Sequence, residues 1–95
     1  MQTRKRVSDN HRGRLDIIAD ILDTSCGGVK KTYLMYRCNL SFKQLKSYLS
    51  FLIKRELMRV IGDDGNDGNN HGLFEATDKG KEFVRAYRRL EALMN

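Results

Sequence analysis

The stretch from Asn39 to Leu57, NLSFKQLKSYLSFLIKREL, constrains the fold most, because it combines a helix start with about four turns of helical periodicity. Ser41 and Gln44 have the Ser-x-x-Gln spacing of a capping box, in which the hydroxyl and the amide side chain satisfy first-turn amides. One stripe recurs at four- and three-residue steps and is predicted to be buried. It comprises Leu45, Leu49, Leu52 and Glu56, with Tyr48 beside it. We therefore expect an amphipathic helix from Phe42 to about Arg55.

The opposite stripe of this helix carries three positive charges, two hydroxyl groups and no acid. It comprises Lys43, Lys46, Ser47, Ser50 and Lys54. Exposed helical faces usually mix both signs of charge, with acid–base pairs four residues apart. The stripe therefore favours a polyanionic partner, and the alternative is an ordinary solvated polar face.

The charge of the whole chain is also asymmetric. The net charge is +6 over 95 residues, and residues 1–14 and 30–56 are the strongly basic segments. Such an asymmetry favours nucleic acid as the partner, while solubilising lysine is the alternative. The length is that of one domain with one modest core.

The sequence argues against several other classes of protein. No apolar run approaches the roughly 18 to 20 residues that cross a bilayer, and the basic start MQTRKRVSDN has no apolar stretch behind it. We expect no membrane partner and a cytoplasmic, nucleoid-associated chain.

Metal, cofactor and catalytic motifs are not evident. Cys26 and Cys38 lack the paired spacing of a zinc site, and we expect one near a helix end and the other in the core. The loop of Asp63, Asp67 and Gly68 lacks the closing Glu of an EF-hand. We therefore predict no metal, no cofactor, no small-molecule ligand and no enzymatic activity.

The remaining elements follow from periodicity and turn residues. A helix is expected from about Asn10 to Thr24, with Gly27 or Gly28 available for a left-handed C-cap. Its apolar face comprises Leu15, Ile17, Ile18, Ala19, Ile21 and Leu22. A short helix, 31–38, precedes the capping box. Strands 58–61 and 73–76 flank a polar loop, and Thr77 is placed to cap a last helix, 78–95.

Three helices followed by a hairpin form a winged helix-turn-helix, a mainly α fold with a small β-hairpin (α+β). We divide the chain into a flexible basic arm (1–9), a winged helix-turn-helix domain (10–76) and a C-terminal amphipathic helix (77–95). That helix carries a predicted homodimer interface of Phe83, Tyr87, Leu90, Leu93 and Met94. Phe83 and Tyr87 are expected to pack on the first helix of the same chain as well. The alternative is that the whole stripe folds back on its own core.

The sequence resembles the small archaeal winged helix-turn-helix transcriptional regulators over about residues 12–92. The resemblance rests on RLDIIADIL at 14–22, KKTYLMYRCNLSFKQLKSYLSFLIKREL at 30–57 and TDKGKEFVRAYRRLEAL at 77–93. It implies DNA binding by the helix after the capping box, a wing on the backbone or minor groove, and dimerisation through the last helix. The loop DDGNDGNN departs from a phosphate-gripping wing, because it is acidic and has no Lys or Arg.

The predicted partner is double-stranded DNA. Lysines are expected on phosphates, and the polar side chains of the helix on base edges. The predicted DNA-binding residues are Lys30, Lys31, Tyr33, Ser41, Lys43, Gln44, Lys46, Ser47, Ser50 and Lys54, with Arg4, Lys5 and Arg6 as a possible DNA-binding arm. Gln44 also has a duty in the helix cap. Phe42 and Phe51 are the features that favour the alternative function, a module that binds protein.

Overall fold

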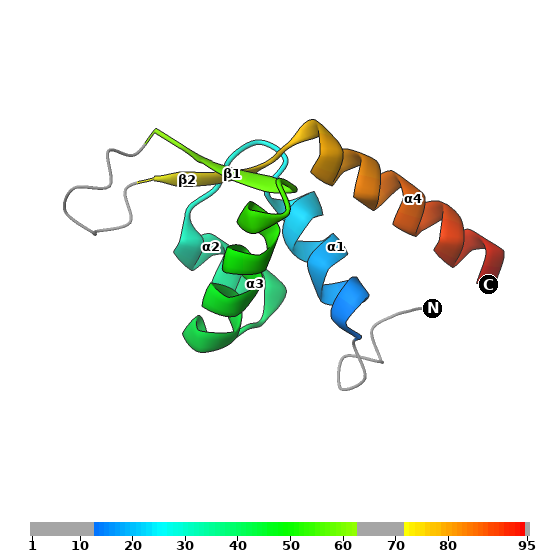
Figure 1. Ribbon diagram of the computed structural model, residues 1–95. Helices are drawn as coiled ribbons and strands as arrows, with labels where there is room; N and C mark the ends of the chain where they lie inside the picture. The colour runs from blue at the N-terminus through cyan, green and yellow to red at the C-terminus, as the bar shows by residue number, and fades with distance from the viewer. Residues whose placement is uncertain (1–12, 63–71, 95) are drawn as a thin grey trace.

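A computed structural model describes residues 13–62 and 72–94 of the chain. In chain order its elements are α1 (Arg14–Thr24), α2 (Lys31–Cys38), α3 (Phe42–Lys54), β1 (Met58–Ile61), β2 (Leu73–Ala76) and α4 (Asp78–Met94) (Figure 1). This order confirms the predicted α+β fold. The predicted start of the first helix at about Asn10 is wrong, because Gly13 is extended, with ψ 172°, and is the N-cap of a helix that begins at Arg14. The predicted arm 1–9, the loop 63–71 and residue 95 lie outside the described residues.

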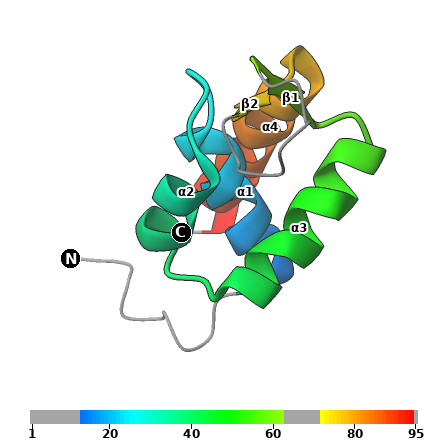
Figure 2. The same ribbon diagram turned by 90° about the vertical axis from the view of Figure 1, so that its left-hand side faces the viewer.

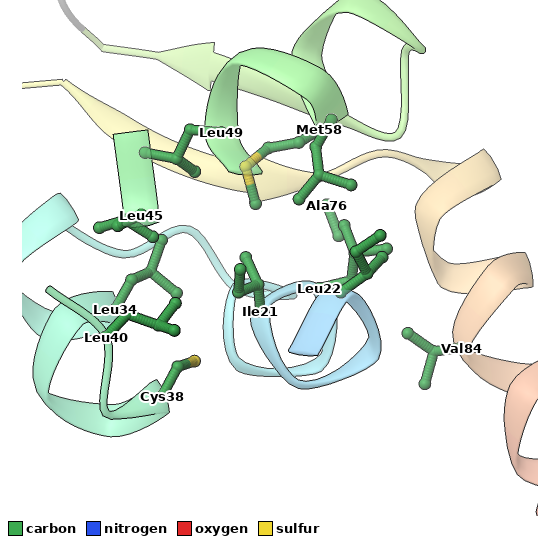
Figure 3. Packing of buried hydrophobic residues seen from close by; sticks show 12 residues of the cluster. Ile21, Leu22, Leu34, Cys38, Leu40, Leu45, Leu49, Met58, Ala76 and Val84 are labelled. Carbon is green, nitrogen blue, oxygen red and sulfur yellow. The ribbon is translucent and has the colours of Figure 1, made fainter. Parts of the chain in front are cut away.

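A single hydrophobic core lies between the first three helices and the hairpin. Figure 3 shows Leu34 of α2, Leu45 of α3 and Met58 of β1 converging on Ile21 and Leu22 of α1. Cys38 is fully buried in this core, as the sequence predicts, and Cys26 is partly exposed just beyond α1.

Two residues of the predicted apolar stripes of α1 and α3 are exposed. The side chain of Leu15, in the first turn of α1, is 53% exposed. Glu56 is exposed because α3 ends at Lys54, and its backbone turns into the left-handed region with φ 64°. The helical period therefore does not extend to Glu56.

The turn between α2 and α3 is built from local hydrogen bonds. Asn39 is left-handed, with φ 55°, and the Leu40 amide donates to Met35 O at 3.0 Å. This six-to-one bond is that of a Schellman motif, in which Asn tolerates the left-handed residue. The predicted capping box then starts α3. The backbone amide of Gln44 donates to Ser41 Oγ at 3.1 Å, and the backbone amide of Ser41 donates to Gln44 Oε1 at 2.9 Å.

The two strands of the hairpin are antiparallel, and the segment before α2 forms an additional bridge to β2. Met58 is opposite Ala76, and Arg59 is opposite Glu75, with which it forms an ion pair at 2.8 Å. Val29 pairs with Phe74 through two backbone bonds of 3.0 and 2.7 Å. The sequence did not predict this bridge.

The predicted left-handed cap of α1 is wrong. The helix ends at Ser25, whose φ of −97° is not left-handed. The left-handed residue is Gly28, with φ 86°, three positions later. It turns the chain toward the bridge at Val29, beside the side chains of Ile61 and Leu73.

Helix α4 starts against the end of α3 and then runs along α1. The Gly80 amide donates to Thr77 Oγ1 at 3.1 Å, which confirms the predicted cap. Val84 is buried, and Arg88 forms an ion pair with Asp23 at 2.7 Å. Figure 1 shows α4 on the side of α1 away from α3, with its C-terminal end directed away from the hairpin. None of the described helices is long and apolar enough to cross a membrane.

Candidate nucleic-acid interface

The outer face of α3 is open to solvent and rich in polar groups. Figure 2 shows α3 along one edge of the molecule. The residues predicted to bind DNA here are all exposed, and they are Ser41, Lys43, Gln44, Lys46, Ser47, Ser50 and Lys54. The helical repeat places Lys43, Ser47, Ser50 and Lys54 on the face opposite Leu45, Leu49 and Leu52. Gln44 and Lys46 lie on the two flanks of that face, and Ser41 lies at the N-terminal end of the helix.

The capping box defines what Gln44 and Ser41 can offer to a ligand. Gln44 uses Oε1 to accept from the Ser41 amide, which leaves its amide nitrogen as the donor that could face a ligand. Ser41 Oγ accepts from the backbone amide of Gln44 and retains its own hydroxyl proton as a donor. Both side chains lie at the N-terminal end of α3, where recognition helices place base contacts.

The start of α2 adjoins the start of α3 through a cation and an aromatic ring. Lys31 is partly buried, and its Nζ lies 4.8 Å from the centroid of the Phe42 ring. Lys30, the N-cap of α2, and Tyr33, in its first turn, are exposed. Lys31 thus lies next to the N-terminal end of α3. The predicted arm residues Arg4, Lys5 and Arg6 lie outside the described residues.

A second cluster of cation and ring was not expected from the sequence. The Arg14 guanidinium carbon lies 5.1 Å from the centroid of the Phe51 ring, and that of Arg55 lies 5.0 Å from it. The spacing of Phe51 and Arg55, four residues apart, was visible in the sequence. The approach of Arg14 was not, because it depends on how α1 crosses α3.

Ion pairs neutralise arginines elsewhere on the surface. Arg59 pairs with Glu75, Arg88 pairs with Asp23, and Arg85 pairs with Glu82 at 2.8 Å. The hydrogen bond from Arg85 lowers the pKa of the Glu82 carboxyl below its usual value. The lysines of α3 form no ion pair with another described residue. The positive charge of the α3 lysines is therefore not compensated by a described acid.

Comparison with known proteins identifies the family to which this fold belongs. A family model described as winged helix-turn-helix matches residues 11–95. The chain belongs to the winged helix-turn-helix family. This confirms the family resemblance drawn from the sequence. No curated protein sequence matches the chain.

Solved structures with the same fold include a DNA-binding protein and a repressor. The DNA-binding protein Sso10a-2 from Sulfolobus solfataricus superposes with a TM-score of 0.72 at 23% identity, over 87% of this chain and 82% of that one. The multiple antibiotic-resistance repressor MarR from Listeria monocytogenes 4b F2365 superposes with a TM-score of 0.56 at 15% identity, over 84% of this chain and 56% of that one. In this winged helix-turn-helix protein, α2 and α3 form the helix-turn-helix, and β1 and β2 form the base of the wing.

The end of α4 presents apolar side chains to solvent. Phe83 and Tyr87 are half-buried, and their rings stack with centroids 6.5 Å apart. Leu90 is 53% exposed, Leu93 is 83% exposed and Met94 is 79% exposed. The buried line of α4 is instead formed by Gly80 and Val84, and the sequence analysis did not single out Val84.

Proposed function

We propose that this protein is a DNA-binding regulator that inserts α3 into the major groove of duplex DNA as a homodimer. The observation that carries the proposal is the exposed, acid-free face of α3. The major groove is about 12 Å wide and admits an α-helix. Lys43, Lys46 and Lys54 would neutralise phosphates, while Gln44 and Ser47 would meet base edges.

The start of α2 supports the same orientation. Helix-turn-helix proteins place the first helix of the motif across the DNA backbone. Lys30, Lys31 and Tyr33 lie at that end of α2 and would contact phosphates there. The similarity to Sso10a-2, a DNA-binding protein, and to the MarR repressor agrees with this proposal at the level of fold.

The alternative function, a module that binds protein, has less support. It relied on Phe42 and Phe51, and each of these rings lies under at least one cation. Phe51 is also half-buried against the core. A cation-covered ring bordered by lysines suits a polyanion better than an apolar partner. A chromatin-like binder without sequence preference is a form of the same proposal.

The test is a titration of duplex DNA over a range of salt concentrations. Each phosphate neutralised contributes about −0.9 to the slope of log affinity against log salt. Lys46→Ala is therefore expected to bind more weakly at low salt and to reduce the slope by about one unit. The control is Arg89→Ala, which removes one exposed positive charge from α4, on the other side of α1.

Equal affinity and slope for Lys46→Ala and wild type would contradict the placement of α3 in the groove. Equal losses for Lys46→Ala and Arg89→Ala would contradict it too, because they would indicate attraction by net charge alone. Random duplex and enriched duplex compared at one salt concentration separate a sequence-specific regulator from a chromatin-like binder.

A further inference from the structure

The polar face of α3 is bordered by an aromatic ring on each side. At about 3.6 residues per turn, Phe42 and Phe51 project from opposite flanks of the stripe of Lys43, Ser47 and Ser50. Lys31 from α2 covers Phe42, and Arg14 from α1 together with Arg55 covers Phe51. Each ring therefore holds beside α3 at least one cation from another helix, from α2 on one flank and from α1 on the other.

This arrangement matches the geometry of a groove. A helix in the major groove has one phosphate backbone along each of its flanks, because the groove lies between the two strands. Cations fixed on both flanks of α3 would face both backbones. Lys31 was predicted to contact DNA, while Arg14 and Arg55 have no role in the interface described so far.

We infer that Arg14 and Arg55, positioned by the ring of Phe51, form a second phosphate-binding site on the flank of α3 opposite Lys31. This inference rests on the proposed function. Both arginines are exposed, and neither forms an ion pair with another described residue. Guanidinium groups stack on aromatic faces while their N–H donors remain free to bind phosphate oxygens. The ring restricts the motion of two long side chains, so less conformational entropy is lost when phosphate binds.

The experiment measures duplex affinity against salt for the full chain and for single variants. Arg14→Ala and Arg55→Ala are each expected to reduce the salt slope by about one unit. Phe51→Leu retains apolar volume but removes the ring, so both arginines keep their charge and lose their support. It is expected to weaken binding about twofold to fivefold, the factor that corresponds to a cation–ring contact at an exposed site. Phe51→Tyr keeps the ring and is expected to bind like wild type.

A double-mutant cycle tests the positioning directly. Arg14→Ala should weaken binding less in the Phe51→Leu background than in the wild type, because the ring no longer holds the guanidinium. Thermal unfolding of every variant separates this effect from loss of the fold. Arg14→Gln is the substitute if Arg14→Ala unfolds.

The outcomes separate this inference from the proposed function. Wild-type affinity and slope in both arginine variants, with a loss in Lys46→Ala, would overturn the second site and leave α3 in the groove. Additive effects of Arg14→Ala and Phe51→Leu would overturn the role of the ring. Wild-type protein that shows no salt-dependent binding to duplex would overturn the proposed function itself.

Discussion

At the scale of single residues, Gly80 is the position where the fold tolerates no side chain. A Cβ there would overlap the carbonyl oxygen of Leu57 and lie 3.2 Å from Cδ2 of Leu22. The three-residue spacing of Thr77 and Gly80 at the start of α4 therefore has a physical explanation. Thr77 supplies the cap, and the glycine allows the first turn to lie directly against the backbone that joins α3 to β1.

Gly80→Ala is expected to lower the free energy of unfolding by about 1 to 3 kcal/mol, the usual cost of overpacking a filled site. This loss should appear although alanine is the better helix former by about 1 kcal/mol. Urea unfolding measures it. The control is Gly27→Ala, where a Cβ would meet nothing within 4 Å. A Gly80→Ala protein as stable as Gly27→Ala would show that α4 is not seated as described.

The residues that sequence reasoning misplaced share one cause. Leu15 and Glu56 continue an apolar or helical period beyond the packed part of their helices. Periodicity shows which side chains share a face, but the neighbours of that face determine where burial ends. Val84 was missed for a related reason. The apolar stripe of α4 is broad, and only one edge of it is buried. That edge contains Gly80 and Val84.

At the scale of elements, the end of α3 contains backbone strain that one substitution can relieve. Glu56 is left-handed, while its amide donates to Ile53 O at 3.0 Å and the Leu57 amide donates to Leu52 O at 2.9 Å. These bonds form a Schellman motif with glutamate where glycine is usual. A left-handed residue that has a Cβ costs about 1 to 2 kcal/mol.

Glu56→Gly is expected to be about 1 kcal/mol more stable than Glu56→Ala, because both lose the carboxylate but only glycine relieves the left-handed strain. Thermal and urea unfolding of the two variants check this. The carbonyl of residue 56, which accepts from Thr77 Oγ1 at 2.7 Å, is unchanged in both. Equal stability of the two variants would mean that the turn relaxes out of the left-handed region.

Most element bounds could be predicted from the sequence, because local signals specify them. The capping box starts α3, Thr77 starts α4, and the alternation at 58–61 and 73–76 defines the strands. The Val29–Phe74 bridge could not be predicted, since one residue forms no periodic pattern. The Phe51 cluster depends on the crossing of α1 and α3, about which local sequence holds no information.

At the scale of the whole molecule, α4 is joined to the end of α3 by polar contacts. Thr77 Oγ1 donates to Glu56 O, and Lys79 Nζ donates to Arg55 O at 3.0 Å. The Thr77 amide also donates to Leu57 O at 3.0 Å. These contacts fix the direction in which α4 leaves the helix-turn-helix. If two chains pair through α4, the relative orientation of their α3 helices follows from the same contacts.

The proposed homodimer rests on the exposed end of α4, where Leu90, Leu93 and Met94 project from a helix whose first half packs on α1. Clustered apolar side chains of this kind mark interfaces, and a two-fold dimer presents the same patch from both chains. Such a dimer would present its recognition helices to successive major-groove faces about 34 Å apart and would favour a palindromic site.

Leu90→Glu places a charge in this patch and is expected to give a folded monomer that binds duplex more weakly than wild type. Sedimentation equilibrium measures the state of assembly, and circular dichroism checks the fold. Val60→Glu is the matched control, because the Val60 side chain is also exposed, at 44%, but lies on β1 in the hairpin, from which the C-terminal end of α4 is directed away. The control should remain dimeric, since the charge is added away from the interface. A wild-type chain that is monomeric at tens of micromolar would contradict the dimer. A Leu90→Glu variant that stays dimeric would place the interface elsewhere on the molecule.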